Sequence, residues 1–274
     1  MIKVLRVLLI SLTAFFMTSF PLYAAEVIKI GGTGGAIGTM KIIGKAFEKK
    51  YPGFRVEFLM GIGSNGALRA VPEGAIDIGL STWMLTEKQL SQGISAIQYA
   101  KTPFIFVTKA ELKQNNITTQ DIIKIYSGEK QSWPDGERIR WVLHPAGDSD
   151  TLVVERLSPE VKKALKTALS RRGILIAHTD QENLELIEKT PGAFGYTTLT
   201  QILSEKRPVK ILSLNSIAPG VKTLADGSYP VFTALYIVVK NKQSDKLWKF
   251  IDFVMSEDGA SILKETGNLA VKRK

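Results

Sequence analysis

The chain has 274 residues and no cysteine, and its 36 lysines and arginines outnumber its 26 aspartates and glutamates, which gives a formal charge of +10. The absence of cysteine excludes disulfides and a lipid-modified cysteine, so an exported form must rely on its hydrophobic core. The positive charge favours acidic ligands, but it is equally compatible with an ordinary basic periplasmic protein.

The N-terminus has the pattern of a secretory signal. Lys3 and Arg6 precede an apolar run over residues 7–20, which Pro21 interrupts. This order predicts a signal peptide that is cut after about Ala24, and an uncleaved anchor helix is the alternative. Because the run is short for a membrane span and no cysteine can carry a lipid, we expect a soluble protein of the periplasm.

The first hundred mature residues alternate strands and helices. A strand over residues 27–30, a glycine-rich loop and a helix over 37–50 come first, and residues 54–60 form the next strand. The loop Gly61-Ile62-Gly63-Ser64-Asn65-Gly66 then leads into a helix, and residues 75–81, 94–99 and 103–107 read as strands. This alternation predicts a doubly wound α/β domain with parallel strands.

The middle of the chain predicts a second α/β unit. Its expected strands cover residues 139–143 and 209–212, and a turn over 191–196 leads into another short strand. Its helices cover 120–126, 152–157, 159–169 and 181–189. A long apolar strand over 230–239 and two helices close the chain. We interpret residues 104–108 and 231–239 as two crossings between lobes, which leave a cleft that hinge bending can close.

Three loops follow a strand and open a helix. Free backbone N–H groups and the positive helix end favour an anion at such a place. We expect the three loops to converge on one cleft, although each alone is equally compatible with an ordinary turn. They are Thr33-Gly34-Gly35, Gly63-Ser64-Asn65 and Asp148-Ser149-Asp150-Thr151.

Other functions fit the sequence less well. The spacing of residues 61–66 matches a dinucleotide fingerprint, but Asp77 comes too early for the required acid and Thr82 stands where that acid belongs. His144 and His178 have no motif partner, and no nucleophile elbow or zinc motif is present, so we expect no catalytic residue, metal or cofactor. Short basic clusters without aromatic residues argue against nucleic acid.

Several segments together carry a resemblance to a known family. They are residues 31–35, 61–64, 75–81, 125–128, 133–136, 191–196 and 250–256. In their order and spacing the chain resembles the phosphate-binding proteins of bacterial phosphate ABC transporters. The resemblance implies an α/β protein with the two-lobed type II periplasmic-binding-protein fold, two crossover strands and a central ligand cleft. The implied divisions are a signal peptide over 1–24, lobe 1 over 25–107, lobe 2 over 108–229, and a crossover with return to lobe 1 over 230–274.

The resemblance also implies the residues that contact phosphate. The family's first and second contact loops fall on the Thr33 and Ser64 loops, and its third on Ser149-Asp150-Thr151. After the serine that ends the strand at 75–81 the family often has Asp or Arg, whereas this chain has Thr82. The resulting candidates are Thr33, Gly34, Gly35, Ser64, Asn65, Ser81, Thr82, Asp148, Ser149, Asp150 and Thr151.

The chain departs from the family near the third loop. His144 and Pro145 stand where the family often has arginine, and Asp148 and Asp150 stand where glycine is usual. A carboxylate beside an anion is repulsive unless a proton lies between them, so either aspartate could accept the proton of phosphate and select phosphate over sulfate. The alternative is that Asp148 caps the helix and Asp150 faces solvent.

The resulting expectation is a monomeric periplasmic solute-binding protein that captures inorganic phosphate for an ABC permease in the inner membrane. Another oxyanion such as sulfate, molybdate or a phosphonate is an alternative ligand. An exported phosphate sensor or sequestering protein without a permease is a rival function. A hydrolase on the same fold is disfavoured because the sequence offers no nucleophile–base pair.

Overall fold

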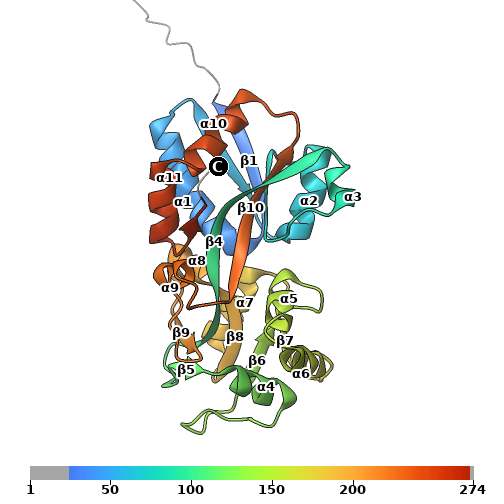
Figure 1. Ribbon diagram of the computed structural model, residues 1–274, viewed down its shortest axis with the longest axis vertical. Coiled ribbons are helices and arrows are strands. Elements are labelled where there is room, and N and C mark those ends of the chain that lie inside the picture. The colour runs from blue at the N-terminus through green and yellow to red at the C-terminus, as the bar shows by residue number, and fades with distance from the viewer. Residues whose placement is uncertain (1–24, 272–274) are drawn as a thin grey trace, which may run out of the picture.

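The computed structural model describes residues 25–271, and the expected signal peptide lies outside them. Figure 1 shows two bodies, one above the other, with the long strand β4 (Ile94–Lys109) running from the upper body into the lower. We call the upper body lobe 1 and the lower body lobe 2. Within residues 25–271 no helix combines the length and the apolar character that crossing a membrane requires.

Lobe 1 is a sheet with helices on both faces. Its strand order is β2-β1-β3-β10-β4, in which β1 pairs in parallel with β2 and β3, while β10 pairs antiparallel with β3 and β4. The sequence pattern predicts parallel strands, but the sheet is mixed. The difference arises because β10, from the C-terminal part of the chain, pairs antiparallel with β3 and β4. The remaining strands are β1 (Glu26–Gly32), β2 (Phe54–Leu59), β3 (Ile78–Ser81), β10 (Phe232–Lys240) and the short β11 (Leu269–Ala270).

The two faces of this sheet have separate apolar cores. On one face Phe47 of α1 packs edge-to-face against Phe250 of α10, with ring centroids 5.1 Å apart. On the other face Val71 of α2 packs against Val238 of β10 in a smaller cluster. The helices of this lobe are α1 (Gly34–Lys50), α2 (Gly63–Glu73), α3 (Glu87–Leu90), α10 (Asp245–Val254) and α11 (Glu257–Glu265).

Lobe 2 continues from the far half of β4. There β4 pairs antiparallel with β8 and β9, and β6 pairs in parallel with β8 and β7. Its other strands are β5 (Asn116–Ile117), β6 (Arg140–Leu143), β7 (Leu175–Ile176), β8 (Ala193–Thr198) and β9 (Val209–Leu214). Its helices are α4 (Thr119–Ser127), α5 (Ser149–Glu155), α6 (Pro159–Leu169), α7 (Asp180–Lys189), α8 (Leu199–Glu205) and α9 (Val221–Ala225).

β4 joins the lobes as one continuous strand, although the sequence pattern predicts two strands over residues 94–99 and 103–107. Thr102 precedes Pro103, and a residue before proline favours the extended conformation, so the chain stays extended through the junction. The second connection comes from Val231, whose carbonyl accepts a hydrogen bond from Phe104 N at 3.0 Å. The lobe boundaries at residues 107 and 229 stay predictions.

Polar side chains hold the two lobes together near these connections. Thr39 of α1 and Thr200 of α8 share a hydrogen bond of 2.6 Å between their hydroxyl groups. Thr102 on β4 accepts a bond from Thr200 N and donates one to Gly267 O, both at 3.1 Å. All three threonines are buried, so these bonds fix how α8 lies against α1.

Candidate functional site

Four helix starts surround one small cavity between the lobes. The cavity has a volume of about 50 Å³, and each surrounding helix follows a strand: α1 after β1, α2 after β2, α5 after β6 and α7 after β7. The lining residues are Thr33, Gly34, Gly61, Gly63, Ser64, His144, Asp148, Ser149, His178, Thr179, Asp180 and Gln181. All three loops that the sequence predicts to bind an anion therefore contribute to it.

The α1 start already holds an anionic group. Gly35 N donates a hydrogen bond of 2.7 Å to Asp180 Oδ2, and the Thr33 hydroxyl donates one of 3.3 Å to the same oxygen. The space beside them is tight, because a Cβ on Gly34 would lie 2.5 Å from Gln181 Oε1 and 2.8 Å from Asp180 Oδ2, and those side chains would have to move. The positive end of this helix thus faces a carboxylate from lobe 2.

The α2 start presents a buried hydroxyl to the cavity. Ser64 is 6% exposed; its Oγ accepts a hydrogen bond of 3.2 Å from Thr82 N and shares one of 3.3 Å with the Thr82 hydroxyl. Asn65 is exposed and does not line the cavity. The Ser81 hydroxyl accepts a bond from Trp83 N at 2.9 Å and so stabilises the turn after β3.

The α5 start carries two of the predicted aspartates in different roles. Asp148 caps the helix by accepting a hydrogen bond of 2.9 Å from Asp150 N. This agrees with the alternative prediction that Asp148 is a helix cap. Asp150 is buried rather than facing solvent. Burial, followed by the nearby charges of Asp180 and Asp148, raises the pKa of Asp150 well above its ordinary value, which favours the protonated carboxyl.

Thr151 lies behind the cavity. Its hydroxyl donates to His144 O at 3.2 Å and shares a hydrogen bond of 3.0 Å with the Tyr196 hydroxyl. Tyr196 OH also accepts from His144 N at 3.2 Å. In this arrangement Thr151 positions the backbone of His144, and Ser149 is the hydroxyl of its loop that lines the cavity.

Four lining residues come from a helix start that the candidate list above does not contain. Thr179 caps α7 by accepting from Glu182 N at 3.1 Å, and Asp180 and Gln181 form the first turn. The Thr-x-x-Glu pattern at 179–182 marks such a start in the sequence, and residues 175–176 before it form a strand. His178 lies at the same edge.

The charges of the lining are unusual for an anion site. Asp148 and Asp180 line the cavity together with His144 and His178, and the lining contains no lysine or arginine. Burial raises the pKa of Asp180, and the hydrogen bonds from Gly35 N and the Thr33 hydroxyl oppose that rise. Hydrogen-bond donors and helix ends, rather than a basic side chain, must therefore attract an anion here.

A larger cavity of about 540 Å³ adjoins this one. Ser149 lines both cavities, and Thr82, the predicted residue after β3, lines the larger one. Trp83, Met84 and residues of β10 also line it, together with Val153, Arg156 and Leu157, so an arginine lines the larger cavity although none lines the smaller. The small polar cavity is therefore the inner part of a wider cleft between the lobes.

Comparison with known proteins identifies the superfamily of this chain. The model of the PBP superfamily domain matches residues 23–258. The chain belongs to the PBP superfamily. Phosphate-binding protein PstS of Borreliella burgdorferi is 30% identical over 219 residues, which are 77% of each chain. Phosphate-binding protein PstS of Bacillus subtilis is 25% identical over 257 residues, 90% of this chain and 82% of the relative.

Solved structures of this superfamily share the fold. A Clostridium perfringens substrate-binding protein assigned to a phosphate ABC transporter, with bound phosphate, has a TM-score of 0.75 at 19% identity and covers 90% of this chain and 100% of its own. The Azotobacter vinelandii periplasmic molybdate-binding protein has a TM-score of 0.62 at 17% identity, with 89% and 100% covered. These likenesses confirm the predicted type II fold.

The superfamily also settles the class of activity. Its members bind a substrate without transforming it, which confirms the prediction that this chain is not an enzyme. The fold is common to phosphate- and molybdate-binding proteins, so the fold alone does not choose the ligand.

Proposed function

We propose that this chain captures inorganic phosphate in the small cavity between its lobes and delivers it to an ABC permease. Capture takes place in the periplasm, after removal of the signal peptide. The named relatives support the ligand, and the convergence of the Thr33, Ser64 and Ser149 loops on one cavity supports the place.

One observation carries the proposal. The Asp180 carboxylate oxygen accepts hydrogen bonds from Gly35 N and the Thr33 hydroxyl, so the α1 start favours a negatively charged oxygen in the arrangement described here. Phosphate bound beside that carboxylate would take hydrogen bonds from the Ser64 and Ser149 hydroxyls and from the start of α1 at Gly34, which line the same cavity.

The carboxylates give this site its selectivity in our proposal. Asp148 and Asp180 line the cavity and Asp150 lies behind them, so a bound anion needs a proton to share with them. Phosphate carries such a proton at neutral pH and sulfate does not. Phosphate should therefore bind more tightly than sulfate.

Calorimetry tests this function directly. Phosphate, sulfate, molybdate and a phosphonate are titrated into the mature chain, purified without chelators, at neutral pH. We expect one phosphate per chain and no measurable heat from sulfate. Equal binding of both ions would contradict the proton-sharing argument, and the absence of phosphate binding would contradict the function.

Another oxyanion is the second candidate. The cavity lining lacks an arginine or lysine, and a molybdate-binding protein has the same fold. Tighter binding of molybdate or a phosphonate than of phosphate in the same titrations would favour it.

A further inference from the structure

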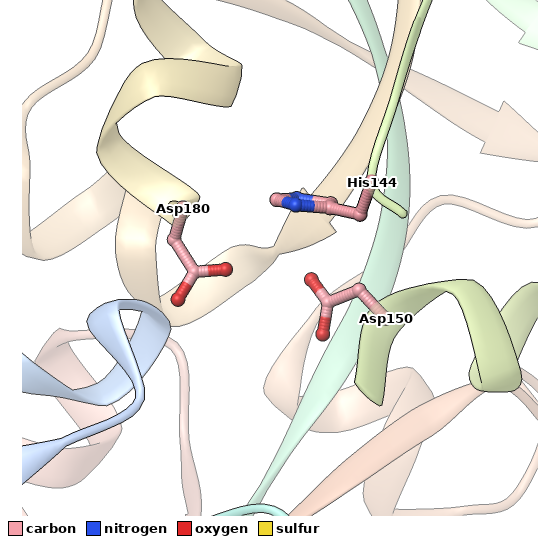
Figure 2. Close-up of side chains that lie close together, drawn as sticks. All are labelled: His144, Asp150 and Asp180. Atoms are coloured by element: carbon pink, nitrogen blue, oxygen red, sulfur yellow. The ribbon is translucent and has the colours of Figure 1, made fainter. Parts of the chain in front are cut away.

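Three side chains with metal-binding atoms meet beside the cavity. One ligand atom each of His144, Asp150 and Asp180 lies within 4.8 Å of the other two. Figure 2 shows the imidazole pointing between the two carboxylates, which approach from the starts of α5 and α7. His144 and Asp150 share one loop, Asp180 comes from a later helix start, and the three match no zinc motif, so the sequence predicts no metal here.

The histidine is prepared to bind a cation. His144 is 1% exposed, and its Nδ1 lies 3.0 Å from Ala177 O, which can only accept, so the proton belongs on Nδ1. This tautomer leaves a lone pair on Nε2, and Nε2 has no hydrogen-bond partner among residues 25–271. A buried polar atom without a partner calls for an explanation, and a histidine held through its other nitrogen is the usual form of a metal ligand.

One carboxylate is held in a similar way. Oδ2 of Asp180 accepts from Gly35 N at 2.7 Å and from Thr33 Oγ1 at 3.3 Å. In Figure 2 the other oxygen of Asp180 faces His144 and Asp150. Lobe 1 thus fixes the orientation of a carboxylate whose free oxygen completes a set of one nitrogen and two oxygens.

We propose that His144 Nε2, Asp150 and Asp180 bind a divalent first-row metal cation such as Zn²⁺, and that an oxygen of the bound oxyanion completes its coordination. The second half rests on the proposed function. Three protein ligands of nitrogen and oxygen suit zinc and leave a fourth position open. Tetrahedral ligands at about 2.0–2.2 Å from zinc lie roughly 3.3–3.6 Å apart, so any ligand atoms that are farther apart than this must approach one another on binding.

Such a cation would resolve the charge problem of the cavity. Asp148 and Asp180 line the cavity that would hold the anion, and no lysine or arginine lines it. A divalent cation held by His144, Asp150 and Asp180 would offset this negative charge and attract the oxyanion.

Zinc titration into the metal-stripped, phosphate-free mature chain tests the metal site. Calorimetry should show one Zn²⁺ per chain. Asp180→Asn and Asp150→Asn should each weaken zinc binding by more than about tenfold, because even the loss of a partner behind a metal ligand costs about 10–100-fold. Asp226→Asn is the matched control, since Asp226 bonds Ser228 and does not line the cavity.

Circular dichroism checks that each variant is folded. Because Asp180 is only partly buried, we expect Asp180→Asn to fold, and it tests the site even if Asp150→Asn unfolds. An absence of zinc binding by the wild type, or equal zinc affinity of Asp180→Asn and wild type, would overturn the metal site.

Phosphate titration with and without zinc tests the shared coordination. Zinc should raise phosphate affinity at least about tenfold, and phosphate should tighten zinc by the same factor, because coupling between two ligands is reciprocal. If the chain binds phosphate in the presence of a chelator and binds no zinc, the metal inference is overturned and the proposed function is supported. Zinc binding without phosphate binding under either condition would support the metal site, overturn the shared coordination and contradict the proposed function.

Discussion

The Ser64 hydroxyl is the donor whose removal perturbs the proposed anion site most simply. Ser64 lies in the first turn of α2, is 6% exposed and lines the cavity. Its Oγ accepts from Thr82 N at 3.2 Å and shares a bond of 3.3 Å with the Thr82 hydroxyl; when Thr82 donates in that bond, the Ser64 proton can point to a ligand. Ser64→Ala therefore removes one donor to the anion and one acceptor for Thr82.

The expected loss follows from the charge of the ligand. A hydrogen bond to a charged group contributes about 1.5–3 kcal/mol, which corresponds to roughly 10–150-fold in phosphate affinity. The same change leaves Thr82 N without its acceptor, and we expect a decrease of about 1 kcal/mol in the free energy of unfolding. The two effects are separable because one is measured by ligand titration and the other by denaturation.

Calorimetry of phosphate binding and urea unfolding of the ligand-free chain provide the assay. Ser170→Ala is the matched control, because the Ser170 hydroxyl donates to Thr167 O at 2.9 Å and does not line the cavity. The control should keep wild-type affinity. An unchanged phosphate affinity in folded Ser64→Ala would remove Ser64 from the site and refute the reasoning.

Two further predictions concern closure and pH. Gly34→Ala should lower phosphate affinity by about tenfold, because its Cβ would meet Asp180 Oδ2 at 2.8 Å and push the lobes apart, while Gly53→Ala, with open space around it, should not. In α4, burial acts to raise the pKa of Asp121, but hydrogen bonds, above all from Lys130, outweigh it and lower the pKa. Asp121→Asn should therefore destabilise the chain by about 1 kcal/mol in urea unfolding at neutral pH, and this difference should vanish as the pH falls through the lowered pKa. An unchanged phosphate affinity of Gly34→Ala would contradict the first prediction. A loss of unfolding free energy in Asp121→Asn that does not depend on pH would contradict the second.

Much of the fold follows from local patterns that the chain obeys. The helix starts at residues 34, 63 and 149 lie at or within a few residues of the glycine and hydroxyl signals, because these residues supply the conformations and caps that a helix start needs. The mixed sheet does not follow from such patterns. The pairing of β10 with β3 and β4 joins segments over a hundred residues apart, and no local signal specifies that partner.

The site was predictable to a similar degree. Thr33, Ser64 and Ser149 converge as expected because each follows a strand at the same edge of its lobe. The role of Asp180 was not predictable, because its contact with Gly35 crosses between the lobes and depends on how α7 meets α1. Thr151 stays a predicted phosphate contact, although its hydroxyl bonds His144 O and the Tyr196 hydroxyl and does not line the cavity.

The central claim is that a phosphate ion binds in the small cavity between the lobes. A crystal structure of the mature chain grown with phosphate tests this claim most directly. The account predicts a tetrahedral ion with oxygens about 2.7–3.2 Å from Ser64 Oγ and from the donors at the start of α1. A phosphate located only in the larger cavity, without contact to Ser64 or Thr33, would contradict it.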